Sequence, residues 1–135
     1  MSSLNVRRTT LQAENRSWLR GPHGTEPGSN PNATLLVSLF TAGSHYPNGY
    51  IPSGIVLGKV TASGVYGPYD AAATDGRQTA VGFLFGSQTI DGADRVASGI
   101  LIHGFVNATK LPIQTGTGSL DAAARTSLAG KIYFD

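Results

Sequence analysis

The sequence predicts a mainly β protein, with one short helix near its C-terminus and an extended or disordered N-terminal arm. Between residues 46 and 108, short apolar runs alternate with Gly, Pro, Asn and Asp, which is typical of tightly turned strands. Charged residues make up only 13% of the chain, against roughly 25% in ordinary globular domains. A chain of 135 residues can bury one core, so we expect one domain with an appendage.

Charge and composition argue against several classes of function. The net charge of +2 resides in the first 30 residues, because basic and acidic residues balance in the rest of the chain. So small a net charge gives a weak electrostatic field, and basic residues are not interleaved with aromatic ones. The sequence therefore does not support direct nucleic-acid binding. The absence of cysteine excludes disulfides and thiolate metal sites. No run resembles a signal peptide or a membrane span, so we expect a soluble protein that is made in the cytoplasm.

Residues 1–34 are predicted to form the N-terminal arm, and residues 35–135 the β-rich domain. The arm is polar, and its few large apolar side chains follow neither a helical nor a strand period. Residues 21–31 are rich in Gly and Pro and should be irregular. Trp18 allows two interpretations. It can fold back on the domain, or it can anchor a partner, because Trp and Arg contribute strongly to interfaces.

The domain is predicted to contain several strands separated by turns rich in Pro, Asn, Asp and Gly. The predicted strands cover residues 32–41, 55–61, 79–85, 98–106 and 131–135. The strand over 98–106 is the most apolar of these. Because its alternation places apolar side chains on both faces, it should be central or covered on one face by another subunit.

The tail carries the one helical signal. Residues 121–130 are rich in alanine, either Ser119 or Asp121 can cap the helix, and Gly130 can end it. In the last predicted strand, Tyr133 and Phe134 are expected to tie the C-terminus into the domain.

A catalytic or metal site cannot be assembled from these residues. The histidines are scattered, and His103, in an apolar strand, is more simply explained by a structural hydrogen bond than by catalysis or metal binding. Nucleotide-binding, metalloprotease and hydrolase motifs are absent. The aspartates, including Asp70 and Asp75, lie in turns, where they commonly bind local backbone. We therefore predict no enzyme activity, no cofactor and no metal.

The many glycines, the few surface charges and the polar arm are more typical of a subunit of an assembly than of a monomeric globular protein. A closed ring, such as a trimer, would give each subunit a heterologous interface that covers an exposed apolar face.

Two stretches, residues 51–85 and 99–112, resemble the head decoration proteins of tailed phages, whose type member is the decoration protein of phage lambda. The recurring elements are SGIVLGK, the turn GPYD, the hairpin DGRQTAVGFLF and the exit VNATKLP. The arm segment NRSWLRGPHGT, residues 15–25, is similar to leaders of decoration-like proteins of actinobacterial phages.

The resemblance implies a β-clip-like domain that forms homotrimers on threefold and quasi-threefold sites of an expanded phage head. There it would clamp neighbouring capsomers against the pressure of packaged DNA, on the outer surface of the virion. The arm would pair with strands of the major capsid protein. The predicted capsid-binding residues are Trp18, Leu19, Arg20, Leu35, Leu36, Val37, Leu39 and Phe40. The predicted trimer interface contains Tyr66, Pro68, Tyr69, His103 and Phe105.

Two alternatives stay open. A trimeric β-clip nucleotide hydrolase would need an acidic cluster for magnesium, which the scattered turn aspartates do not supply. A glycan- or surface-binding module could use its tyrosines as an aromatic platform, although packing around the two Pro-containing turns explains them more simply. The tyrosines concerned are Tyr46, Tyr50, Tyr66 and Tyr69.

Overall fold

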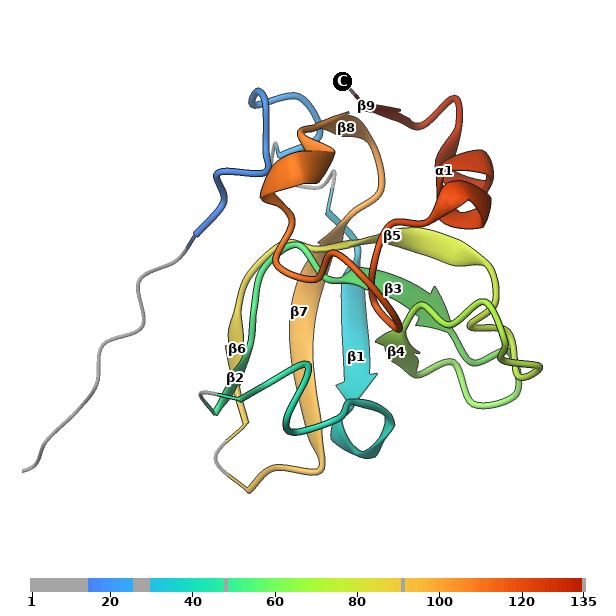
Figure 1. Cartoon of the computed structure of the whole chain (residues 1–135). Helices are drawn as coiled ribbons and strands as arrows, with labels where there is room; N and C mark the ends of the chain where they lie inside the picture. Colours follow the sequence, from blue (N-terminus) through green and yellow to red (C-terminus); the bar gives the residue numbers. More distant parts are fainter. Residues whose placement is uncertain (1–14, 26–29, 48, 91, 135) are drawn as a thin grey trace, which may run out of the picture.

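The computed structural model describes residues 15–25, 30–47, 49–90 and 92–134. Its centre is a closed five-stranded barrel with the strand order β1-β4-β3-β5-β7 (Figure 1). The barrel strands are β1 (Asn32–Leu36), β3 (Val56–Lys59), β4 (Tyr66–Pro68), β5 (Ala80–Leu84) and β7 (Arg95–Leu101). This architecture confirms the predicted mainly β fold.

The pairing of β1 with β7 closes the barrel. These two strands run antiparallel over five residue pairs, from Asn32 opposite Gly99 to Leu36 opposite Arg95. On its other side β1 pairs in parallel with β4, where Leu35 lies opposite Tyr66. Every barrel strand thus has a neighbour on both sides, which satisfies its backbone groups and removes exposed sheet edges.

Two small sheets flank the barrel. β2 (Tyr50–Ile51) pairs antiparallel with β6 (Gln88–Thr89), and β8 (Gly104–Val106) pairs in parallel with β9 (Ile132–Phe134). One-turn 3-10 helices, η1 (Val37–Leu39) and η2 (Ala108–Lys110), follow β1 and β8. No helix of the described residues has the length and apolar character needed to cross a membrane.

The predicted C-terminal helix is present as α1 (Ala122–Leu128). Asp121 is its N-cap, since a carboxylate oxygen accepts the backbone N–H of Ala124 at 2.8 Å. Ala124 and Leu128 are buried, and Gly130 takes a positive φ of 85° just after the helix. Local capping and spacing therefore predicted this element correctly.

The predicted strand over residues 98–106 is wrong as a single element. The structure divides it into β7 and β8, with a break at Ile102 and His103. The break lets the chain leave the barrel after Leu101 and pair with β9 instead. Similarly, the strand predicted over 32–41 stops at Leu36, where η1 begins.

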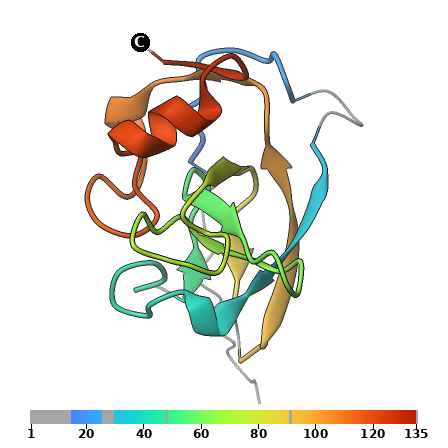
Figure 2. The same ribbon diagram turned by 90° about the vertical axis from the view of Figure 1, so that its right-hand side faces the viewer.

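Several of the elements outside the barrel form one layer over its upper end. This layer, called the cap here, consists of residues 15–25, β8, η2, α1 and β9, and both views place it above the barrel (Figures 1 and 2). One buried cluster joins the cap to β3 and β5, and a second fills the rest of the barrel. The largest members of the first cluster are Trp18, Tyr69, Phe83, Leu101 and Leu128.

Candidate functional site

Residues 15–25 of the arm form part of the cap. Leu19 forms an antiparallel bridge with Val106. The backbone N–H of Arg20 donates to the carbonyl of Phe105 at 3.0 Å, and that of Asn107 donates to the carbonyl of Trp18 at 2.7 Å. Residues 18–20 therefore pair with the side of β8 that faces away from β9. As predicted for residues 21–31, the described residues 21–25, 30 and 31 lie in no helix or strand, whereas the last residues of the predicted arm, 32–34, belong to β1; residues 1–14 and 26–29 lie outside the described residues.

Trp18 fixes the base of the arm. Its side chain is only 1% exposed, and its indole N–H donates to the hydroxyl of Ser53 at 3.2 Å. The ring of Phe83 stacks against it. The structure therefore shows the first of the two interpretations, in which Trp18 folds back on its own domain.

The predicted capsid-binding residues fall into two separate places. Trp18, Leu19 and Arg20 lie together on the cap, where Arg20 is exposed. The others lie in β1, η1 and the residue that follows, at the opposite end of the barrel (Figure 1). Among these, Leu35, Val37 and Phe40 are buried, whereas Leu36 and Leu39 are half-buried. Their capsid contacts stay a prediction.

The predicted trimer-interface residues also form two groups. Tyr66 is half-buried on β4, next to the buried Pro68 and Tyr69. His103 and Phe105 are exposed on the cap. The structure thus does not bring these residues into one patch, and their role in a trimer stays a prediction.

Two stacked rings stand out on the cap surface. Phe105 of β8 and Tyr133 of β9 are register partners, with ring centroids 5.3 Å apart and planes inclined by 24°. They are 39% and 59% exposed, and are the exposed large hydrophobic side chains of the described residues. Such a pair is a candidate contact for another protein.

The sequence did not indicate Tyr133 as a candidate contact residue. This residue was expected to tie the C-terminus into the domain, as Phe134 does through its edge-on contact with Phe83. Instead Tyr133 points outward, because successive side chains of a strand point to opposite faces and Ile132 is buried. The alternation of side chains along β9 indicates that Tyr133 and Ile132 point to opposite faces. The parallel pairing of β9 with β8, which places Tyr133 beside Phe105, could not be read from the sequence.

A pair of histidines lies beside these rings. His23 Nε2 and His103 Nδ1 are 2.7 Å apart and share a hydrogen bond, and the ring of His23 also packs against Phe105. His103 therefore has the kind of hydrogen bond that was expected, but its partner is a second imidazole.

His45 has a purely structural position. It is buried, its Nδ1 accepts the backbone N–H of Thr41 at 2.8 Å, and its Nε2–H donates to the carbonyl of Thr117 at 2.8 Å. Both ring nitrogens are occupied, so His45 ties two loops together.

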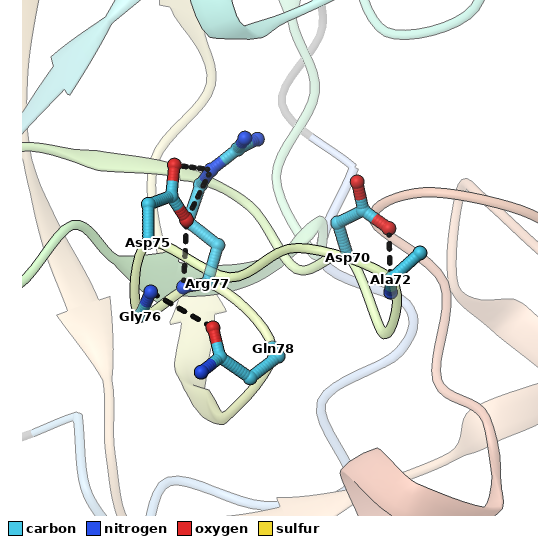
Figure 3. Close-up of polar contacts among 6 residues, drawn as sticks. All are labelled: Asp70, Ala72, Asp75, Gly76, Arg77 and Gln78. Atoms are coloured by element: carbon cyan, nitrogen blue, oxygen red, sulfur yellow. Dashed lines mark hydrogen bonds and ion pairs between the residues drawn. The ribbon is translucent and has the colours of Figure 1, made fainter.

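The turn aspartates bind local backbone, as predicted (Figure 3). Asp70 accepts the N–H of Ala72 at 3.0 Å. Asp75 accepts the N–H of Arg77 at 3.2 Å and forms an ion pair with its Nε at 3.0 Å. The backbone hydrogen bond from Arg77 is the main reason why the pKa of Asp75 is lowered, and the guanidinium adds to it.

A hollow of about 490 Å³ is lined by residues 69–72, 114–117 and 119–121. Tyr69 donates its hydroxyl proton to Asp121 at 2.9 Å. Burial, followed by this hydrogen bond, raises the pKa of Tyr69 to about 12. The phenol therefore stays protonated and positions the helix cap.

The two alternative functions find little support in this geometry. The four tyrosines considered for a glycan platform are buried or half-buried, and Tyr46 and Tyr66 pack against the barrel cluster. Among the described residues, no group of three or more His, Asp or Glu side chains could hold a metal ion. A magnesium-dependent site thus has no ligand set in that part of the chain.

Comparison with protein families gives one finding. Residues 33–131 match the family model described as bacteriophage lambda head decoration protein D. The matched span covers the barrel and nearly all of the cap that follows it, and so includes most of the chain. No curated protein and no solved structure matches the chain.

Proposed function

Because the chain belongs to the bacteriophage lambda head decoration protein D family, we propose a specific way in which it binds and stabilises a phage head. The protein is a structural component of the virion, sits on the capsid surface and is not an enzyme. Family membership implies decoration and stabilisation of the capsid. The proposal concerns the oligomer, the docking contacts and the way in which stabilisation is achieved.

The protein binds as homotrimers at threefold and quasi-threefold sites of the expanded head. In a closed ring, each copy presents one patch to the next copy and a different patch to the previous one. The division of the predicted interface into Tyr66 on β4 and His103 with Phe105 on the cap supports such an arrangement. Tyr133 enlarges the second patch, since it stacks on Phe105. Pro68 and Tyr69, which follow Tyr66 closely in the chain, are buried in the single chain.

The N-terminal arm docks on the major capsid protein. Trp18 and Leu19 hold the base of the arm on the cap, so residues before Asn15 are the part that can reach the shell. A fully extended segment of fourteen residues spans up to about 46 Å, so it can contact a protein well beyond the surface of its own domain. Arg20 is exposed beside the base and can contact the shell directly. The buried residues Leu35, Val37 and Phe40 contribute by holding β1 and η1 in place.

Docking then acts as a clamp. A trimer whose three arms reach different capsomers binds the expanded head and not separated subunits, so binding stabilises the expanded arrangement by mass action. Three linked arms also raise the effective concentration of each contact. The head is thereby reinforced against the pressure of packaged DNA without a covalent step. The single observation that carries the proposal is the family match over residues 33–131.

Co-sedimentation with DNA-free expanded heads of the parent phage tests the proposal. The full chain is compared with a chain that lacks residues 1–14. A deletion of residues 1–34 is unsuitable, because it would also remove Trp18 and part of β1 from the fold. We expect saturable binding of the full chain as trimers, and loss of binding for the shortened chain while it stays folded and trimeric.

Each failure has a distinct meaning. If the full chain does not sediment with the heads, the docking proposal is overturned. If both chains bind equally, the domain makes the contacts and the assignment of docking to the arm is wrong. If the full chain binds as a monomer, the clamp model fails even though decoration stands.

A further inference from the structure

The two histidines on the cap are arranged like a pair of metal ligands. His23 comes from the arm and His103 from the turn between β7 and β8, yet Nε2 of the first lies 2.7 Å from Nδ1 of the second. The rings meet edge-on, with centroids 4.8 Å apart and planes inclined by 61°. Two nitrogens, each with a lone pair available in one tautomer, therefore converge on a single point at the surface.

The backbone holds this pair in place. Each histidine is followed by a glycine, and the two His-Gly pairs pack directly on each other. A Cβ atom on Gly24 would collide with the carbonyl oxygen of His103, and one on Gly104 would lie 2.8 Å from the carbonyl oxygen of His23. Asn30 fastens the same segment, since its side-chain amide donates to the carbonyls of Gly24 and Ile100. The two imidazoles are thus preorganised by their main chains.

We propose that His23 Nε2 and His103 Nδ1 form a two-ligand site for a divalent transition-metal ion, with Zn²⁺ as the probe. Zn–N bonds of about 2.0–2.1 Å with tetrahedral or right-angled geometry require nitrogens about 2.9–3.4 Å apart. The present separation of 2.7 Å needs to open by only a few tenths of an ångström. Both side chains are exposed in the single chain, so the ion can reach them there.

The proton balance of this exchange is simple. In the hydrogen-bonded pair, one of the two facing nitrogens carries a proton and the other accepts it. When the metal binds, the donor ring moves that proton to its other nitrogen, and both facing lone pairs bind the ion. Two neutral imidazoles therefore bind the metal without net proton release, and no other reactant is needed.

The donor set defines the class of ion. Imidazole nitrogens suit Zn²⁺, Ni²⁺ and Cu²⁺, whereas Ca²⁺ and Mg²⁺ prefer oxygen ligands. No third His, Asp or Glu side chain completes a site in the described residues. The bound ion would fasten the arm at residue 23 to the turn after β7. Both ligands come from one chain, so the site does not need the proposed docking; His103 is also a residue of the proposed trimer interface.

An atom-specific measurement tests the site. The full chain without an affinity tag, labelled with ¹⁵N, is titrated with ZnCl₂, and the histidine ring nitrogens are followed by long-range ¹H–¹⁵N NMR. We expect saturable shifts of His23 Nε2 and His103 Nδ1 at one ion per chain, with the ring nitrogens of buried His45 unchanged. The outer nitrogen of the donor ring should also shift, because it takes up the proton. Metal binding at His23 Nδ1 or His103 Nε2 in place of the facing nitrogens, or no saturable shift, would overturn the proposal.

Variants give a second, independent readout. His23→Gln and His103→Gln should each abolish the one-to-one binding and the rise in melting temperature that Zn²⁺ causes in the unchanged chain. Lys131→Gln is the matched control, because Lys131 is an exposed cap residue with no role in the pair, and it should retain both effects. Unchanged Zn²⁺ binding in either histidine variant would show that the ion binds elsewhere and that the two imidazoles only share a proton.

Discussion

Trp18 of the N-terminal arm stacks on Phe83 of β5, with ring centroids 5.5 Å apart and planes inclined by 27°. The contact joins the start of the described chain to the wall of the barrel, across the cluster that unites the barrel with the cap. The base of the arm is therefore part of the hydrophobic core.

Replacement of Trp18 should weaken the fold strongly. Trp18→Ala removes a buried ring and leaves a cavity, so we expect a loss of about 3–5 kcal/mol in the free energy of unfolding, measured by urea denaturation. Tyr133→Ala is the control, since it truncates an exposed ring and should change this free energy by less than about 1 kcal/mol. Equal effects of the two substitutions would show that the arm does not pack as described.

Gly24 should control how firmly the arm is held. Its φ is +85°, and a side chain there would collide with His103, so Gly24→Ala should release the arm segment and accelerate its cleavage by protease. Gly21→Ala provides the matched control, because nothing lies within 4 Å of a Cβ at that position. Limited proteolysis followed by mass spectrometry identifies the cleavage sites. Identical patterns for the two variants would contradict this packing.

Tyr69 should make stability depend on alkaline pH. Its folded-state pKa is raised to about 12, so its contribution is complete below pH 10, the ordinary pKa of tyrosine, and is lost as the pH rises from 10 to 12. We expect the unfolding free energy to fall by about 1–1.5 kcal/mol by pH 11 from this residue. Urea denaturation at several pH values measures it.

The matching variant isolates this effect. Tyr69→Phe lacks the hydrogen bond to Asp121, so at pH 7 it should be less stable by about 1 kcal/mol. The difference from the unchanged protein should then shrink above pH 10. Tyr133→Phe, which alters an exposed ring, should keep the pH dependence of the unchanged protein. A constant difference between pH 8 and 11 would refute the role of Tyr69.

The stacked rings on the cap should matter for assembly more than for folding. A Phe105→Ser, Tyr133→Ser double variant removes the exposed pair and should raise the dissociation constant of the proposed trimer by more than about tenfold, a loss of about 1.4 kcal/mol. Sedimentation equilibrium measures this change. Thr89→Ala, exposed on β6, serves as a surface control. If the double variant stays trimeric but no longer binds to heads, the two rings contact the capsid and not the neighbouring subunit.

Much of the local structure could be predicted from the sequence. The alanine-rich run and the cap Asp121 predicted α1, and the apolar runs predicted strands close to β3, β5 and β9. The turn aspartates were assigned correctly because an Asp side chain reaches backbone groups two residues away. Each of these predictions depends on neighbours within one or two turns of chain.

The misses have a common cause. The break between β7 and β8 depends on the parallel pairing with β9. The choice between the two interpretations of Trp18, which the sequence left open, depends on its contacts with Phe83 and Ser53. His23 and His103 are 80 residues apart in the chain, so no periodicity could indicate that they touch. In the same way, the sequence favoured a core position for Tyr133, and its exposed position depends on how β9 packs on the domain.

The order of amino acids thus decided which segments become strands, turns or helix, and its motifs pointed to the decoration family. Folding in three dimensions decided that β1 and β7 close a barrel, that the base of the arm enters the core, and that two rings and two histidines meet on the cap. Local conformation follows from backbone sterics and side chains a few bonds away. The sites, in contrast, arise from contacts between distant segments, whose position depends on how all buried surfaces pack together.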